Sequence, residues 1–208
     1  MNKTWITLAA TSAGLAASLA ATPAFAQAVV GQLAPAFAAV PDTQGKPASL
    51  ADFKGKYVVL EWVNPGCPFV QKHYNSGNMP ATQKSAEAKG VVWLSVNSTA
   101  RDASDYKSPA DLNAWLQSKG ATPTATLMDA DGKLGKAYGA RTTPHMYVID
   151  PQGKLIYAGA IDSKASANPA DIKTATNYIT QALAEAQAGK AVSHPTSPAY
   201  GCSVKYAS

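Results

Sequence analysis

The stretch from Tyr57 to Val70 constrains this chain more than any other part of the sequence. Its first half, residues 57–63, is an apolar run rich in β-branched and aromatic residues, and the turn-forming residues 64–66 follow it. Such a run predicts a buried strand near the centre of a sheet. Cys67 and Pro68 come next. Proline is well tolerated in the first turn of a helix, because its missing N–H would have no partner there.

We therefore expect Cys67 at the start of a helix, just past the carboxyl end of a buried strand. Ligands and catalytic groups gather at this end of the strands in open α/β sheets. Unpaired N–H groups and the helix dipole favour a thiolate over a thiol there, and the thiolate is the reactive form. The alternative is an inert cysteine in the core, since free cysteine is among the most buried residue types. The helix-start position favours a reactive, accessible sulfur.

The remaining pattern predicts an alternation of strands and helices. A helix from 68 to 89, interrupted at 75–80, and a second buried strand at 91–96 imply a right-handed parallel crossover. The other expected elements are a strand at 37–40 with a turn at 41–45, a helical turn at 49–56, helices at 108–120 and 168–189, a strand at 125–128, a helical turn at 134–138, and a hairpin at 146–160.

The first 26 residues have the layout of a secretory signal peptide. Lys3 precedes an apolar run from Trp5 to Leu19, and a small-x-small cleavage site ends at Ala26. A membrane anchor is the alternative, but the run is shorter than the roughly 20 apolar residues that a span requires. We expect cleavage, no membrane span afterwards, and a periplasmic or secreted protein. The remaining chain suits one α/β domain at residues 27–189 and a tail at 190–208.

Charge and motifs exclude several classes of function. The formal net charge is +5, and the lysines are scattered without a basic cluster, so we interpret them as solvated surface rather than a nucleic-acid site. The sequence has no phosphate-binding glycine loop after a strand and no paired CxxC or HExxH motif. We expect no nucleic-acid partner.

The chain contains two cysteines, Cys67 and Cys202. An exported compartment is oxidising, which favours a pair. Cys202 lies in the tail, where prolines and glycine argue against regular structure, and we expect the tail to be ordered or semi-ordered. A second feature is Pro144, which opens the strand of the hairpin. X-Pro bonds are the ones that adopt the cis form, and the order of elements predicts a cis proline facing Cys67.

These features resemble the thioredoxin superfamily, specifically its peroxiredoxin-like or redoxin (AhpC/TSA-type) branch. The resemblance covers roughly residues 29–189 and depends on the stretches 31–37, 50–56, 64–70 and 143–144. It implies an α/β, thioredoxin-like fold with a central mixed β-sheet and helices on both faces, with Pro144 opposite Cys67. It also implies an antioxidant thiol enzyme without a cofactor, whose partners are protein or small-molecule thiols and disulfides, with peroxides as a further substrate class.

The sequence departs from the cysteine motifs of both thioredoxins and peroxiredoxins. Val70 occupies the second cysteine position of the thioredoxin CxxC motif, which excludes a dithiol within that motif. Peroxiredoxins carry a proline and a Thr or Ser seven and three residues before their cysteine, where this chain has Leu60 and Asn64. The peroxiredoxin arginine falls near Pro144, and nothing shows that the neighbouring Arg141 replaces it. Thiol–disulfide exchange is therefore favoured over peroxide reduction.

Two roles for Cys202 remain open at this point. It can resolve a mixed disulfide on Cys67, with Cys67, Cys202 and Pro144 as the catalytic residues. Alternatively, a permanent Cys67–Cys202 disulfide staples the tail of a non-catalytic module and stabilises it by about 5 kcal/mol in the chain-entropy model.

A copper or zinc site is a further hypothesis, from another class. Cys67, His73 and His145, together with Cys202, Met79 or Met146, offer suitable N and S ligands, but their spacing matches no metal motif, and we predict no metal. Glu61 lies inside the central strand, where a charge is costly unless it is paired. We expect it to pair with a lysine at an edge rather than to form a site.

Overall fold

A five-stranded sheet forms the centre of the molecule. The computed structural model describes residue 1 and residues 27–207, so the expected signal peptide at 1–26 lies almost wholly outside the described residues. The strand order is β5–β4–β3–β7–β8. The strands are β3 (Val58–Trp62), β4 (Val92–Asn97), β5 (Ala125–Met128), β7 (His145–Ile149) and β8 (Leu155–Gly159). All five occupy the predicted segments.

The strand β3 lies in the middle of this sheet, as its apolar run predicts. It runs parallel to β4 and antiparallel to β7, so the sheet is mixed. Its side chains alternate between two apolar clusters: Val59 and Val63 face one, whereas Leu60 and Trp62 face the other. Each fully buried aliphatic side chain contributes about 1.5–3 kcal/mol. Burial on both faces explains why this strand lacks the polar alternation of a surface strand.

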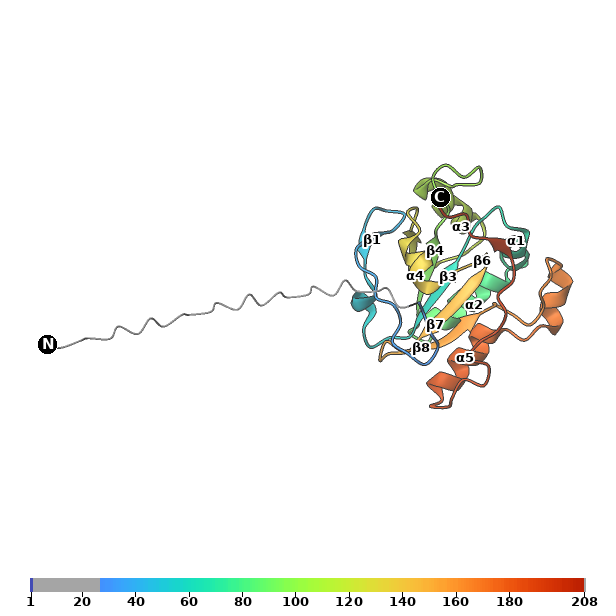
Figure 1. Cartoon of the computed structure of the whole chain (residues 1–208). Helices are drawn as coiled ribbons and strands as arrows, with labels where there is room; N and C mark the ends of the chain where they lie inside the picture. Colours follow the sequence, from blue (N-terminus) through green and yellow to red (C-terminus); the bar gives the residue numbers. More distant parts are fainter. Residues whose placement is uncertain (2–26, 208) are drawn as a thin grey trace.

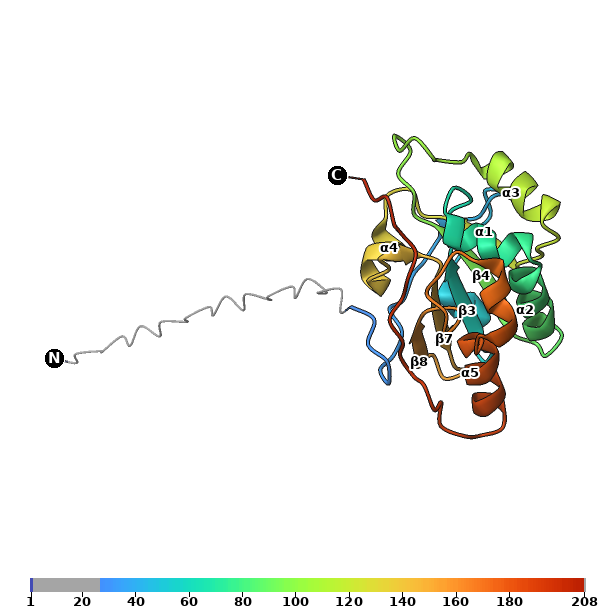
Figure 2. The same ribbon diagram turned by 90° about the vertical axis from the view of Figure 1, so that its right-hand side faces the viewer.

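Helices cover both faces of the sheet, which confirms the predicted fold class (Figure 2). On the first face lie α1 (Pro68–Asn75), α2 (Asn78–Glu87), α3 (Pro109–Ser118) and α5 (Tyr178–Gln187). On the second lie α4 (Lys133–Tyr138) and the 3₁₀ turn η1 (Leu50–Phe53). The predicted break between α1 and α2 falls at Gly77, whose φ is +75°. That left-handed conformation favours glycine.

The helix predicted over 168–189 is wrong in its first half. Residues Pro169–Thr174 form a 3₁₀ helix (η2), Ala175 is extended, and α5 begins only at Tyr178. Thr176 explains the interruption, because its carbonyl accepts from the Ser163 N–H at 3.1 Å and its N–H donates to the Ser163 hydroxyl at 3.0 Å. These contacts with a distant loop hold the chain extended. The strand expected at 37–40 is likewise shorter, and the hairpin consists of β1 (Val40–Pro41) and β2 (Pro47–Ala48).

The tail, residues 190–207, is ordered and crosses the molecule from the end of α5 to the far end of the sheet (Figures 1 and 2). It first pairs with β8, where the Ala158 N–H donates to the Pro195 carbonyl at 3.1 Å. It then forms a short strand, β9 (Cys202–Ser203), antiparallel to β6 (Thr142–Thr143). The expectation that this tail lacks regular structure is therefore wrong at Cys202. Among the helices described, none is long and apolar enough to cross a membrane.

Candidate active site

The turn after β3 places Cys67 at the start of α1, as predicted. The Asn64 side chain accepts from the Gly66 N–H at 2.8 Å, and the Asn64 carbonyl accepts from the Cys67 N–H at 3.0 Å. Cys67 is the N-cap residue, and Pro68 occupies the first turn. A tight turn braced by an asparagine side chain is thus what carries the chain from the buried strand to the helix.

The Cys67 sulfur is buried rather than accessible, which corrects the sequence-based expectation. Its residue is only 2% exposed. The sulfur makes no capping bond with α1; instead, the S–H donates to the Thr143 carbonyl at 3.0 Å, and the Cys202 N–H donates to Sγ at 3.4 Å. The cysteine therefore contacts both the prolyl loop and the tail.

The peptide bond between Thr143 and Pro144 is cis, which confirms the predicted geometry of this loop. Pro144 separates β6 from β7, so it stands beside the carboxyl end of the central strand. The Thr143 carbonyl is the group through which the loop touches Cys67.

Cys202 lies opposite Thr143 in the β6–β9 register. Burial, followed by its hydrogen bond with Cys67, raises the pKa of the Cys202 thiol to about 12. Neither cysteine is in a disulfide in this structure. Gly201 permits the close approach of the tail: a Cβ at this position would overlap the Thr143 carbonyl, and its φ is +139°. The structure thus brings Cys67, Pro144 and Cys202 together.

A buried polar cluster beside the cysteines was not predicted from the sequence. Lys72, on α1, is 2% exposed and its Nζ lies 3.3 Å from Asp162 Oδ2. The Tyr200 hydroxyl, from the tail, donates a short hydrogen bond to Asp162 Oδ1. Lys72 corrects the view that all lysines are solvated. It follows Cys67 by five residues in the sequence, but its partners are 90 and 92 residues away.

His73 belongs to the same cluster and is neutral at pH 7. Burial lowers its pKa to about 4, although the nearby Asp162 opposes this shift. The Asn78 amide donates to His73 Nδ1 at 2.8 Å, which leaves Nε2 to carry the proton and donate to the Tyr200 hydroxyl at 3.2 Å.

His145 is also buried and neutral. Burial, with Arg141 as a lesser cause, lowers its pKa to about 4. Its Nδ1 accepts from the Arg141 N–H at 3.3 Å and lies 3.2 Å from the Tyr147 hydroxyl.

The structure gives no support to the metal hypothesis. Among the described residues, no group of three or more His, Cys, Asp and Glu side chains could hold a metal ion. Met79 and Met146 are fully buried in the apolar core.

Glu61 is fully buried at the centre of the sheet and does not pair with a lysine, contrary to the prediction. Its Oε1 accepts from Tyr74 at 2.7 Å, and its Oε2 accepts from Gln83 at 3.1 Å, Trp93 at 2.8 Å and Ser95 at 3.2 Å. Burial raises the pKa of Glu61, while these hydrogen bonds oppose the shift. The carboxyl group therefore organises the core next to α1.

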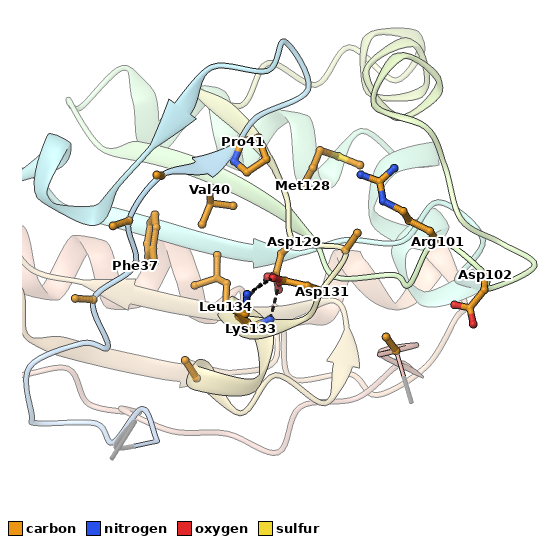
Figure 3. Close-up of a pocket in the computed structure, with 16 residues that line it drawn as sticks. Phe37, Val40, Pro41, Arg101, Asp102, Met128, Asp129, Asp131, Lys133 and Leu134 are labelled. Carbon is orange, nitrogen blue, oxygen red and sulfur yellow. Dashed lines mark hydrogen bonds and ion pairs between the residues drawn. The ribbon is translucent and has the colours of Figure 1, made fainter. Parts of the chain in front are cut away.

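A cavity of about 790 Å³ lies away from the cysteines, on the second face of the sheet. Figure 3 shows its mainly apolar wall, with Phe37, Val40 and Met128 among its residues. Asp129 borders it, but its oxygens already accept from the backbone N–H groups of Leu134 and Gly135. Neither cysteine lines this cavity. The cysteines lie instead with the apolar cluster on the opposite face of the sheet.

Comparison with known proteins supports a redox protein. Residues 30–158 match the model of the AhpC/TSA family. The chain is 28% identical over 127 residues to thiol-disulfide oxidoreductase ResA of Bacillus thuringiensis, covering 61% of this chain and 67% of that protein. It is 30% identical over 141 residues to thiol:disulfide interchange protein DsbE of Pseudomonas aeruginosa, covering 66% and 71%.

Solved structures confirm the thioredoxin-like fold. An uncharacterized conserved protein from Geobacillus kaustophilus has a TM-score of 0.72 at 25% identity, over 86% of this chain and 93% of that chain. The thioredoxin domain of a thiol-disulfide oxidoreductase from Bacteroides vulgatus has a TM-score of 0.50 at 25% identity, over 62% and 87%.

Proposed function

Because this chain belongs to the AhpC/TSA family and holds Cys67 against the prolyl loop and Cys202, we propose that it is a thiol–disulfide oxidoreductase working through Cys67 and Cys202. Its working unit is a thioredoxin-like domain at residues 27–189 with a tail at 190–208 that supplies the second cysteine. The observation that carries the proposal is the 3.4 Å contact from the Cys202 N–H to Cys67 Sγ. The relatives named ResA and DsbE support the reaction class.

The first chemical step takes place at Cys67. The Cys67 thiol loses its proton, and the thiolate attacks one sulfur of a substrate disulfide. A bond forms between Cys67 Sγ and that sulfur, the substrate S–S bond breaks, and the other substrate sulfur leaves as a thiolate that takes up a proton. The product is a mixed disulfide on Cys67.

The second step uses Cys202. Its thiolate attacks Cys67 Sγ, the remaining substrate sulfur leaves as a thiol, and a Cys67–Cys202 disulfide forms. The substrate has then gained two electrons and the protein has lost two. The same steps in reverse oxidise a dithiol substrate, so the chemistry is an exchange in either direction.

The electrostatics support this order of attack. The pKa of Cys202 is about 12 while the Cys67 sulfur lies free beside it, so Cys202 remains a thiol at neutral pH. A mixed disulfide on Cys67 removes the charge that this sulfur can carry, which is one of the causes of the shift. Burial, the largest cause of the raised pKa of Cys202, remains at the stage when Cys202 has to attack, while the contribution of the Cys67 charge is lost.

Single-cysteine variants test the proposal. Cys202→Ser should accumulate a mixed disulfide with a substrate such as oxidised glutathione, visible by intact mass, whereas Cys67→Ser should form none on residue 202. Reduction of the disulfide should fall to the background rate in Cys67→Ser. Equal rates in Cys67→Ser and the parent would end the proposal.

Two further measurements distinguish disulfide exchange from peroxide reduction and from a purely structural disulfide. Hydrogen peroxide should be consumed far more slowly than disulfides are exchanged, because Leu60 and Asn64 replace the peroxiredoxin residues. A structural staple would instead give a Cys67–Cys202 bond with a potential below about −300 mV that the glutathione pool does not reduce.

Export to the periplasm or the medium is also part of the proposal, from the signal-peptide pattern at residues 1–26. N-terminal sequencing of the protein from its native host should give Gln27 as the first residue.

A further inference from the structure

The segment that carries Cys202 also covers Cys67. With the tail in place, Cys67 is only 2% exposed, and Tyr200 and Cys202 pack against the apolar cluster that contains it. A thiolate has to approach a disulfide sulfur directly to attack it. A substrate disulfide therefore reaches Cys67 only when this part of the tail moves away.

Tyr200 is the side chain that anchors the tail at this point. Its ring packs edge-on against Phe69 with the centroids 5.8 Å apart, and Lys72 Nζ lies 5.6 Å from the ring centroid. Its hydroxyl donates to Asp162 Oδ1 and lies 3.2 Å from His73 Nε2. Three of these contacts, with Phe69, Lys72 and His73, join Tyr200 to α1, the helix whose N-cap is Cys67.

The polar contacts form a directed chain of donors and acceptors. His73 donates through Nε2 to the Tyr200 hydroxyl, because the Asn78 amide already donates to its Nδ1. The Tyr200 hydroxyl in turn donates to Asp162, whose other oxygen receives Lys72 Nζ at 3.3 Å. Docking of Tyr200 gives His73 Nε2 an acceptor and Asp162 a further donor. Hydrogen bonds to charged groups are among the stronger ones.

The tail is attached on the other side of Cys202 as well. The Ala100 N–H donates to the Lys205 carbonyl at 2.8 Å, and the Lys205 ammonium pairs with Asp105 at 2.8 Å. The latter pair is partly exposed, so it contributes little. The half-buried Tyr200 attachment, two residues before Cys202, therefore acts together with the β6–β9 pairing to hold the cysteine over its partner.

We propose that Tyr200 and Asp162 form a latch that closes the tail over Cys67 and positions Cys202 for attack. With the latch closed, Cys67 is shielded and lies against Cys202. With the latch open, Cys67 receives a substrate disulfide. Tyr200 and Asp162 are positioning residues, and this role rests on the proposed function, since it assigns the two cysteines to one reaction.

Alkylation of Cys67 tests the closing of the latch without any enzymatic assay. In the full chain carrying Cys202→Ser, the reaction of Cys67 with iodoacetamide is followed by intact mass, with and without Tyr200→Phe. The substitution keeps the ring and removes the hydrogen bond to a buried carboxylate, so the rate should rise about tenfold. Tyr57→Phe is the matched control and should leave the rate unchanged, because Tyr57 lies beside Leu155 and Gly189, in a pocket that neither cysteine lines.

Equilibration with glutathione tests the positioning of Cys202. In the two-cysteine chain, Tyr200→Phe should lower the equilibrium constant for the Cys67–Cys202 disulfide about tenfold, because a loosely held Cys202 has a lower effective concentration. Asp162→Asn should act in the same direction, provided that its circular dichroism shows a folded protein; Tyr200→Phe alone suffices otherwise.

The outcomes separate the latch from the proposed function. An unchanged alkylation rate in Tyr200→Phe would overturn the latch even if disulfide exchange through Cys67 is active. A faster alkylation rate with an unchanged glutathione equilibrium would overturn the positioning role of Tyr200. If Cys67→Ser retains full exchange activity, the proposed function fails, while the alkylation rates still report whether the latch exists.

Discussion

Single buried groups in this protein have pKa values that differ from those in water. Glu61 is surrounded by four donors, from Tyr74, Gln83, Trp93 and Ser95, and its pKa is raised by burial. A raised folded pKa means that the folded protein binds the proton more tightly than the unfolded chain does. The stability that Glu61 contributes is thus complete below pH 4.5 and is lost as the pH rises through its folded pKa.

The variant Glu61→Gln tests whether the stability contributed by Glu61 is lost as the pH rises. The amide cannot titrate, so the loss of unfolding free energy above pH 4.5 should be smaller in the variant than in the parent. Glu61→Leu, which leaves four buried donors without an acceptor, should cost at least about 3 kcal/mol. Urea denaturation between pH 4.5 and 8 measures both. A parent and a Gln variant with the same pH dependence would contradict the raised pKa.

His145 should titrate with the opposite sign. Its pKa is about 4 in the folded protein instead of 6.5, so its contribution to stability is complete above pH 6.5 and is lost as the pH falls toward 4. Replacing it with Gln should reduce the loss of unfolding free energy over this range by on the order of 3 kcal/mol. NMR titration of the imidazole gives the midpoint directly, and a value near 6.5 would refute the expectation.

At the scale of elements, the starts of α3 and α5 are capped by side chains that accept from free N–H groups. Asn177 caps α5 by accepting from the N–H groups of Ile179 at 3.1 Å and Thr180 at 3.0 Å. The sequence also offers Asn168–Pro169 as a start, and there only the 3₁₀ helix η2 follows. Asn168 is also a cap, since its side chain accepts from the Ala170 N–H at 3.1 Å. The α-helix begins only at the second cap, because the contacts of Thr176 with Ser163 keep the chain extended before it.

Removing this cap should destabilise the protein without changing the cysteine pair. Asn177→Ala should lower the free energy of unfolding by about 1 kcal/mol. Asn177→Asp keeps an acceptor and adds a favourable charge at the helix start, so it should retain most of that stability, although it loses the donor to Thr82. Equal losses in the two variants, measured by urea denaturation, would show that the cap is not the cause.

At the scale of the whole molecule, the tail runs from the end of the last helix, α5, to Cys67 at the start of α1. Gly201 makes this possible, since a side chain there would meet the Thr143 carbonyl. Gly189 has a positive φ of +71°, but nothing lies near its added Cβ. Substitutions at both glycines introduce backbone strain, but only a side chain at Gly201 would also overlap the prolyl loop. Comparing the two positions therefore distinguishes the effect of the overlap from that of the strain.

Substitution of these glycines should have distinct effects on the cysteines. Gly201→Ala should displace β9, slow the formation of the Cys67–Cys202 disulfide and speed the alkylation of Cys67. Gly189→Ala carries left-handed backbone strain of about 1 kcal/mol without the steric overlap, and it should leave both rates close to those of the parent. Similar rates in the two variants would show that the approach of the tail to Thr143 does not control access to Cys67.

Local signals were sufficient for much of the fold. The apolar run of β3, the turn at Asn64, the proline after Cys67 and the break near Gly77 are features of consecutive residues, and each predicted its element. The single helix predicted over 168–189 is wrong in its first half, because its interruption depends on Ser163, in another loop. Hydrophobic periodicity carries no information about such a partner.

In the candidate active site, too, features set by neighbouring residues were predictable from the sequence, whereas contacts between distant residues were not. The sequence by itself determined the position of Cys67 at a helix start and of a cis proline before β7, since both follow from the local order of residues. Only the tertiary structure decided that Cys67 is buried, because the residue that covers it lies 135 positions away. It also decided that Lys72 is paired with Asp162, 90 positions away. Contacts between distant residues depend on how the tail packs, and no local pattern specifies that packing.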